Sequence, residues 1–204
     1  MAIAIRSSIV ARAVVFEAGV GVLALILGWA LAIPLVDQLL ITPKTVAWGM
    51  AATVPMVVVL AILASMQWSP CRKLLARVRD VAAPLFRDCS VWQLGIVALA
   101  AGMAEELLFR GVLQMEGTRI AGAATAIVLT SLVFGAMHAL TPLYAIFAGF
   151  VSAYLGWLMV ATDSLVPPIV AHAMYDWIAL MYLVRYDRQT VEMAPTSTSG
   201  QGDT

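Results

Sequence analysis

Six segments of the chain are apolar over a length that can cross a lipid bilayer. A transmembrane helix needs about 20 mostly apolar residues. The chain is 62% hydrophobic and 12% charged, whereas soluble domains are about 45–50% apolar and about 25% charged. We therefore expect an all-α fold, a polytopic transmembrane helical bundle of about six spans. The spans are predicted at about 14–36, 46–68, 91–115, 120–140, 142–161 and 165–184.

The first apolar segment is expected to remain in the protein as a membrane span. A signal-peptide core has about 7–15 apolar residues. This segment is longer, and no convincing small-x-small cleavage site stands at its end. Glu17, near its start, is the only charged residue inside it, and its side chain can reach the membrane interface by snorkelling.

The basic residues divide unevenly between the two ends of these spans. Nine lie before the first span, between spans two and three, or after span six, and only Lys44 and Arg119 lie on the opposite side. Cytoplasmic loops carry an excess of Lys and Arg, so we predict a multi-pass protein of the cell (inner) membrane with both termini cytoplasmic. The nine residues are Arg6, Arg12, Arg72, Lys73, Arg77, Arg79, Arg87, Arg185 and Arg188.

Residues 70–88, between the second and third spans, have the pattern of an amphipathic helix on the inner leaflet. Pro70 and Pro84 bracket the segment, and a connector is favoured over a lipid-facing platform. Its apolar residues recur at spacings of three and four, with basic residues between them: Leu74, Leu75, Val78, Val81 and Leu85.

The domain organisation is expected to be simple. Residues 1–192 are predicted to form a single transmembrane domain, and 193–204, rich in Pro, Ser, Thr and Gly, a disordered C-terminal tail. Cys71 and Cys89 flank the basic stretch, where a reducing cytoplasm disfavours a disulfide. Lys and Arg balance Asp and Glu at twelve each, so charge gives no indication of a nucleic-acid partner; the lipid bilayer is the expected environment.

Span five has a stripe of small residues, Ala145, Gly149, Ala153 and Gly156, at spacings of four, four and three. Small residues let membrane helices approach each other closely. We expect this span to support spans four and six.

Spans three, four and six contain ionisable residues that lipid disfavours. A charged side chain at mid-membrane costs at least about 2.5–3.5 kcal/mol on insertion scales, so such residues are interpreted by default as a functional site. The two histidines of the chain are both among them. The residues are Glu105, Glu106 and Arg110 in span three, His138 in span four, and His172 and Asp176 in span six.

Helical spacing predicts some of the contacts that these side chains make. Glu106 and Arg110 are four residues apart, so they share a helix face and are expected to form a structural ion pair. Glu105 is rotated by about 100° from Glu106 and has no obvious local partner.

The same spacing recurs on the other two helices. Phe134 stands one turn before His138, where its ring is expected to support the imidazole. His172 and Asp176 are also four residues apart, so Asp176 can accept an N–H from His172 or from its surroundings.

A free carboxylate beside two imidazoles is suited to hydrolysis of an acyl bond. In a dry site a carboxylate becomes a usable base near neutral pH, so Glu105 can take a proton from water and give it to a leaving amine. His138 and His172 can position that water or stabilise an oxyanion. Two His and one Glu are also a catalytic zinc set, so zinc held by Glu105, His138 and His172 is an alternative.

Two functions other than hydrolysis are compatible with these residues. Intramembrane acids and histidines also build proton relays in transporters and channels. Transporters often show paired halves, whereas here the polar residues lie in one half of the chain without visible symmetry. A catalytically inactive scaffold that binds a membrane partner is the other alternative.

The order of these motifs resembles that of the CPBP intramembrane proteases, the family of the CAAX prenyl endopeptidases and their bacterial relatives, including bacteriocin-processing and abortive-infection-type proteins. The resemblance rests on Glu105-Glu106-x-x-x-Arg110, then Phe134-x-x-x-His138, then His172-x-x-x-Asp176. It covers about residues 90–185, the motif-bearing core, on successive apolar segments.

The resemblance implies an endopeptidase whose site opens toward the cytoplasm and whose substrate is a peptide or protein, expected to be membrane-associated. It implies that Glu105 activates water with help from His138. It implies that His172 and Asp176 contribute to the oxyanion site. Members of the family are described both as metalloproteases and as metal-independent glutamate proteases, so the resemblance leaves zinc open.

Overall fold

The computed structural model describes residues 2–192, and its regular elements are all helices, as the all-α prediction requires. The predicted disordered tail at 193–204 lies outside the described residues. The elements follow in the order α1 (Ala2–Ala30), η1 (Leu35–Leu39), α2 (Pro43–Ser65), α3 (Ser69–Phe86), α4 (Val91–Glu106), η2 (Leu107–Gln114), α5 (Met115–Ala121), α6 (Ala123–Met137), α7 (Pro142–Thr162) and α8 (Val166–Glu192).

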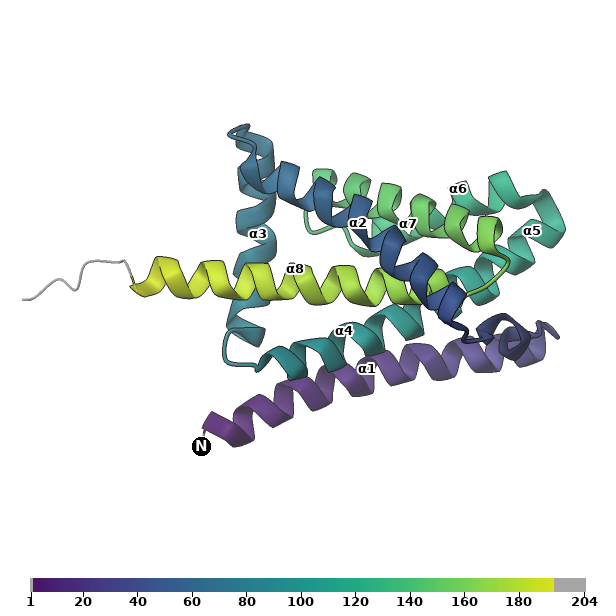
Figure 1. The fold of residues 1–204 in the computed structure, drawn as a ribbon, viewed down its shortest axis with the longest axis horizontal. Helices are drawn as coiled ribbons and strands as arrows, with labels where there is room; N and C mark the ends of the chain where they lie inside the picture. Colours follow the sequence, from purple (N-terminus) through teal and green to yellow (C-terminus); the bar gives the residue numbers. More distant parts are fainter. Residues whose placement is uncertain (1, 193–204) are drawn as a thin grey trace, which may run out of the picture.

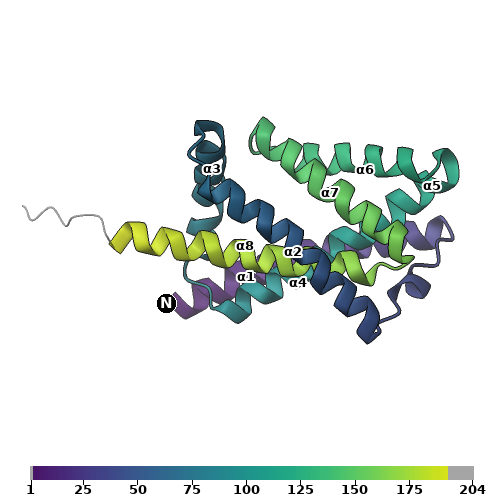
Figure 2. The same cartoon turned by 45° about the horizontal axis from the view of Figure 1, so that its top comes forward.

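Helix α8 is the central element of the bundle. It packs against α2 and α4 along much of its length and also contacts α3 and α7. Figure 1 shows α1, α4 and α8 running along the long axis, with α1 on the outside of α4. Helices α6 and α7 form a pair on the other side of the bundle, visible in Figure 2. The three predicted site motifs therefore lie on α4, α6 and α8, with α8 between the other parts of the fold.

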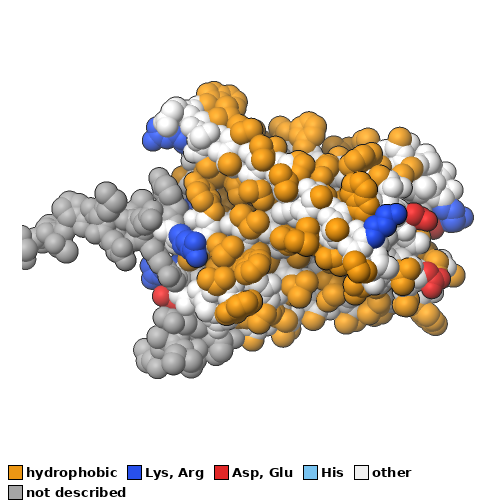
Figure 3. Space-filling model, in the orientation of Figure 1, with side chains coloured by type: hydrophobic (Ala, Val, Ile, Leu, Met, Phe, Trp, Pro, Cys, Tyr) orange, Lys and Arg blue, Asp and Glu red, His pale blue; other side chains and the backbone are white. Residues whose placement is uncertain are grey.

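Within residues 2–192, three helices are long and apolar enough to cross a membrane, judged by length and composition: Ile9–Ala30 within α1, Pro43–Ser65 and Pro142–Thr162. Helix α6 is equally apolar but shorter. Figure 3 shows hydrophobic side chains over the middle of the visible face, with the charged side chains near its two ends. The remaining three of the six predicted spans stay a prediction. The third apolar segment is divided between α4, η2 and α5, and the fourth corresponds to the shorter helix α6.

Local sequence signals explain where the helices of the site begin. Ser90 and Gln93 form a capping box at the start of α4: the Gln93 backbone N–H donates to Ser90 Oγ, and the Ser90 backbone N–H donates to Gln93 Oε1. Thr141 caps α7, which has Pro142 in its first turn. Both arrangements satisfy backbone donors that a helix start leaves open. Gly122, with φ of +83°, separates α5 from α6.

Helix α3 crosses one end of the bundle, as Figures 1 and 2 show. It has the predicted amphipathic character at its start, where Leu74 is buried against the bundle and Arg72 and Lys73 are exposed. Leu85, predicted for the same apolar face, is exposed. The helix continues through Pro84 to Phe86 rather than ending at the proline. Pro84 removes one backbone hydrogen bond and its ring crowds the carbonyl one turn earlier, but only two residues of the helix follow it.

Two glycines permit close helix packing around the site. A Cβ on Gly102 of α4 would lie 2.8 Å from the backbone nitrogen of Ala173 in α8, and a Cβ on Gly135 of α6 would lie 2.5 Å from the carbonyl oxygen of Ala145 in α7. The second contact agrees with the small-residue stripe predicted for span five, since Gly149 also lies against α6. The first approach brings the end of α4 against α8, and the second brings α6 against α7.

Candidate active site

The fold brings together the ionisable residues that lie far apart in the sequence. Glu105 and Glu106 are the last two residues of α4, His138 caps the C-terminus of α6, and His172 and Asp176 lie one turn apart on α8. Helix packing thus joins side chains separated by up to 71 positions in the sequence. Together with Arg110 of η2, these five residues are the six ionisable residues predicted from the sequence, and all six belong to one cluster.

Glu106 is the structural centre of this cluster. Its side chain is fully buried, and its Oε1 lies 3.1 Å from Arg110 Nη1 and 2.7 Å from His172 Nδ1. The contact with Arg110 is the one that the spacing predicted. The contact with His172 comes from tertiary packing and ties α8 to α4 through a hydrogen bond to a charged acceptor, a strong class of hydrogen bond.

Arg110 is also fully buried, and several groups compensate for the loss of water around its charge. Besides Glu106, its Nη2 donates to the carbonyl oxygen of Ser152 at 2.7 Å and approaches Ser152 Oγ at 2.9 Å. The guanidinium carbon lies 5.3 Å from the ring centre of Phe134 and 5.9 Å from that of Phe109, within the range of cation–π attraction. Ser152 fastens α7 to the site and carried no sequence signal.

The segment that holds Arg110 is a π-helix, Leu107–Gln114. Short π-helical turns are rare and often occur at functional sites. The wider turn of a π-helix changes the faces on which the later residues lie. The π-helix ends at Gln114, whose side-chain amide donates to the Gly156 carbonyl oxygen at 2.9 Å. The apolar segment 91–115 predicts a regular helix here, because no residue type marks a π-helix as proline marks a kink.

Glu105 has a different environment from Glu106. Its Oε2 is buried and has no hydrogen-bond partner in the described part of the chain. The same oxygen lies 3.9 Å from Nε2 of His138 and 3.9 Å from Nε2 of His172. These separations are too long for direct hydrogen bonds and are of the kind that a water molecule bridges.

Each histidine is held through one ring nitrogen and presents the other to Glu105. Nδ1 of His138 lies 2.9 Å from the carbonyl oxygen of Phe134, and Nδ1 of His172 lies 2.7 Å from Glu106. Both partners are acceptors, which assigns the Nδ1 proton in each ring. The imidazole of His138 also stacks on Phe134, with ring centres 4.2 Å apart. Nε2 of both rings is thereby aimed at one carboxylate.

Asp176 lies at the edge of the cluster. Its Oδ2 is 3.4 Å from His172 Nε2, and its side chain is partly exposed. It also lines a cavity of about 230 Å³ whose other walls are almost entirely apolar. Asp176 therefore stands where the polar cluster meets an apolar cavity.

Glu17 of α1 is a further acidic residue near the site. Its Oε2 is buried without a hydrogen-bond partner among the described residues, rather than reaching the interface as the snorkelling expectation had it. Its carboxylate is near enough to His172 and Asp176 for their charges to interact. The sequence signal that could have placed Glu17 near the site is that it is the only charged residue in the predicted span 14–36.

The positions of these donors bear on the zinc alternative. Among residues 2–192, no group of three His, Cys, Asp or Glu side chains has an arrangement that could hold a metal ion. Nδ1 of His172 is engaged by Glu106, and its Nε2 is shared between Glu105 and Asp176. This donor set does not fit a zinc site as it stands, so no chemical step is derived through a metal.

The comparisons with known proteins agree with the geometry. Residues 87–178 match the protein-family model described as type II CAAX prenyl endopeptidase Rce1-like. No curated protein and no solved structure matches the chain. The match contains every candidate site residue predicted from the sequence, and it confirms the resemblance to the CAAX proteases. With its long apolar helices, the chain is a membrane protein, and its residues 87–178 are similar to the Rce1-like family of type II CAAX prenyl endopeptidases.

Proposed function

We propose that this protein is an intramembrane endopeptidase that hydrolyses a peptide bond with a water molecule activated by Glu105. The observation that carries the proposal is the position of Glu105 Oε2, unpartnered and 3.9 Å from Nε2 of both His138 and His172. Glu106 is unsuited to this role because Arg110 and His172 already engage it. The two adjacent carboxylates thus divide into a base and a structural anchor.

The proposed reaction begins with water held between Glu105 and the imidazole of His138. Glu105 removes a proton from the water as the water oxygen attacks the carbonyl carbon of the substrate. The C=O double bond becomes a single bond, and the carbonyl oxygen becomes an oxyanion. His172 is the proposed donor to that oxyanion through Nε2–H, in its doubly protonated form, with Glu106 beside Nδ1 and Asp176 beside Nε2. Glu105 then returns the proton to the leaving nitrogen, the C–N bond breaks, and an acid and an amine result.

The cavity beside Asp176 supports a membrane-associated substrate. It lies between α2, α3, α7 and α8, and Tyr144 and Asp176 stand at its polar part. Its remaining walls come mainly from Leu60, Leu63, Leu74, Leu75, Val78, Val81, Phe147 and Leu183. An apolar segment of a peptide or protein substrate fits such walls, with the scissile bond placed at the cluster.

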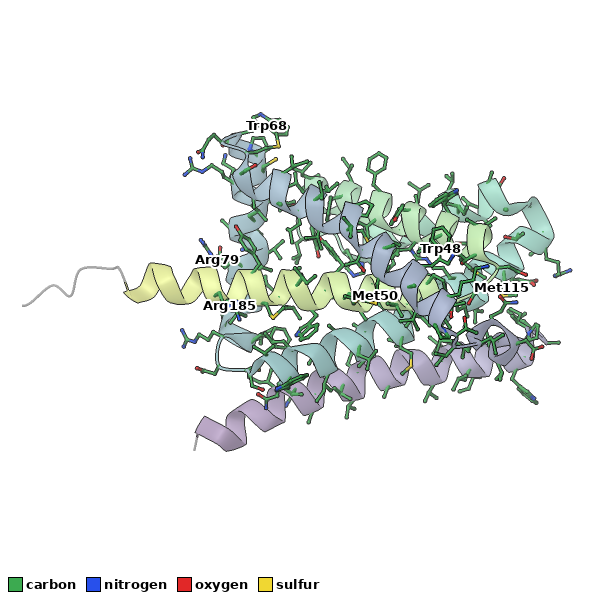
Figure 4. The ribbon with its side chains drawn as sticks, viewed as in Figure 1. Trp48, Met50, Trp68, Arg79, Met115 and Arg185 are labelled. Carbon is green, nitrogen blue, oxygen red and sulfur yellow. The ribbon has the colours of Figure 1, made fainter. Side chains whose placement is uncertain are left out.

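We further propose that residues 1–192 form one domain in the cell (inner) membrane with six spans and cytoplasmic termini. Arg79 and Arg185 lie at the same end of the molecule in Figure 4, and Met115 lies at the other end. This distribution supports a cytoplasmic position for α3 and for the C-terminal end of α8. A periplasm-active reporter fused after Arg188 should be inactive, and strong activity would contradict the six-span topology.

The activity is tested with purified protein in lipid nanodiscs. The probes are internally quenched peptides in two matched sets, one with farnesylcysteine and one with leucine at the same position, and mass spectrometry locates the cut. Wild type should cleave at one bond in at least one set, and Glu105→Gln should not. Ion flux in liposomes without peptide cleavage would favour a transporter or channel instead. Partner binding without cleavage or flux would favour a scaffold.

A further inference from the structure

Helix α1 contributes an acidic group, Glu17, to the surroundings of the site. The other acidic and histidine residues of the site lie within residues 87–178, the segment that matches the family model. Helix α1 lies along α4, and a Cβ on Gly21 would be 3.7 Å from Cβ of Ala104, the residue before Glu105. Glu17 precedes Gly21 by one helical turn on the same face. It therefore faces α4 and the cluster, whereas its neighbours Phe16 and Ala18 are exposed on the outside of α1.

The surroundings of Glu17 are those of a site residue rather than of a surface carboxylate. Its carboxylate interacts electrostatically with His172 and Asp176 on α8, and that of Glu105 interacts with Glu17. Both Glu17 Oε2 and Glu105 Oε2 are buried, and neither has a hydrogen-bond partner in the described part of the chain. Buried polar atoms are almost always hydrogen-bonded, to protein or to ordered water, so these two oxygens require water or substrate beside them.

We propose that Glu17 is a positioning residue of the active site, which accepts a hydrogen bond from the water in the cluster and so orients the molecule that Glu105 activates. This inference rests on the proposed function of the Glu105 cluster. Buried water is typically held by about three hydrogen bonds. Glu105 and Glu17, on different helices, accept the two hydrogen bonds that the water can donate, and Nε2–H of the doubly protonated His172 donates the third. Helix α1, outside the segment matched to the family, is then part of the catalytic unit.

The energetics of α1 favour this role over an incidental charge. A carboxylate within a membrane span costs at least about 2.5–3.5 kcal/mol unless it is compensated. Glu17 lies in a span that is otherwise strongly apolar and mostly exposed on its outer side. A role in catalysis explains why a carboxylate is present at this position, because a stable lipid-facing helix needs none.

The kinetic test compares Glu17→Gln, Glu17→Asp and Glu17→Leu with wild type. The substrate is the internally quenched peptide, from the two matched sets, that wild type cleaves fastest. Ala18→Gln is the matched control, because it places the same amide on the outer face of the same helix. Misplaced reacting groups can cost about a hundredfold in rate, so we expect Glu17→Gln to lower kcat by about that factor with KM unchanged. Glu17→Asp should recover part of the loss, and Ala18→Gln should resemble wild type.

Three results would overturn the role of Glu17: a Glu17→Gln protein with wild-type kcat, an equal loss in Ala18→Gln, or losses that follow a lowered thermal stability. Glu17→Leu guards against the last case, since removing the carboxylate should leave the stability equal or higher while kcat falls. The expected combination of a stable and slow variant is one that a purely structural role does not produce.

A cross-linking experiment separates failure of this inference from failure of the proposed function. In a Cys71→Ala, Cys89→Ala background, Glu17→Cys with Asp176→Cys should be joined by a short bifunctional thiol reagent, and Ala18→Cys with Asp176→Cys should not. Cross-linking of this pair, together with no peptide cleavage by wild type, would count against the protease and leave the placement of Glu17 intact. No cross-link, where wild type cleaves peptide, would overturn the inference.

Discussion

Nδ1 of His172 lies 2.7 Å from Oε1 of Glu106, and this hydrogen bond joins the third motif to the first. Glu106 also binds Arg110, which in turn holds the backbone of Ser152 on α7. One buried carboxylate thereby links α4, η2, α7 and α8. The neighbouring carboxylate, Glu105, is left without such partners, and this difference between adjacent residues is the basis of the first prediction.

Glu106→Gln should lower stability much more than Glu105→Gln does. The change leaves Arg110 as a buried charge without its carboxylate, and breaking a buried ion pair typically costs about 3–5 kcal/mol. The double variant Glu106→Gln, Arg110→Met should recover part of that loss. It should remain inactive, because His172 has still lost its charged hydrogen-bond acceptor. Thermal unfolding in detergent measures the stability, and equal losses in both single variants would show that the two carboxylates are not divided in this way.

Gly102→Ala should both destabilise the protein and reduce cleavage. The added Cβ would meet the backbone of Ala173 at 2.8–3.0 Å, and overpacking of this kind costs about 1–3 kcal/mol. Separation of α4 from α8 would also lengthen the contact between Glu106 and His172. Gly19→Ala is the control, because nothing lies within 4 Å of a Cβ at Gly19. An active, stable Gly102→Ala protein would contradict the close packing of these helices.

A bulky residue in the apolar cavity should weaken substrate binding more than chemistry. Val78 lines this cavity from α3, whereas Leu85 lies on the same helix, outside the cavity and exposed. We expect Val78→Trp to raise KM several-fold with little change in kcat, and Leu85→Trp to behave like wild type. Steady-state kinetics with the fastest peptide checks this. A normal KM in Val78→Trp would show that the substrate does not enter this cavity.

Metal chelators should leave the proposed activity unchanged. The donors around Glu105 are engaged with one another in a way that does not form a metal site among the described residues. The measurement is cleavage after treatment with EDTA and with 1,10-phenanthroline, followed by addition of zinc. Loss of activity that zinc restores would mean that Glu105, His138 and His172 rearrange to hold the ion.

The sequence predicted those features that depend on one helix or on the membrane. Hydrophobic length identified the apolar helices, and the four-residue spacing identified the contact between Glu106 and Arg110, because both partners lie within one turn. The choice of Glu105 as the carboxylate without a local partner followed from the same geometry. Orientation between helices was beyond such reasoning, since spacing within a helix carries no information about its neighbours.

The features that the sequence did not reveal all arise between helices or from backbone geometry. The hydrogen bond from His172 to Glu106 and the support of Arg110 by Ser152 depend on tertiary packing. The π-helix at 107–114 has no characteristic residue pattern. Glu17 was noticed as the only charge in its span, but its direction toward the cluster required the position of α1 against α4.

The most direct test of the account is peptide cleavage by purified wild type, Glu105→Gln, His138→Ala and the double variant in nanodiscs. General acid–base groups contribute about 10²–10⁴-fold, and residues that act as one catalytic unit are strongly non-additive. Each single change should therefore lower kcat by at least about a hundredfold while the protein still inserts, and the double change should lower it little further. Retained cleavage in purified Glu105→Gln protein would contradict the central claim that this carboxylate activates the attacking water.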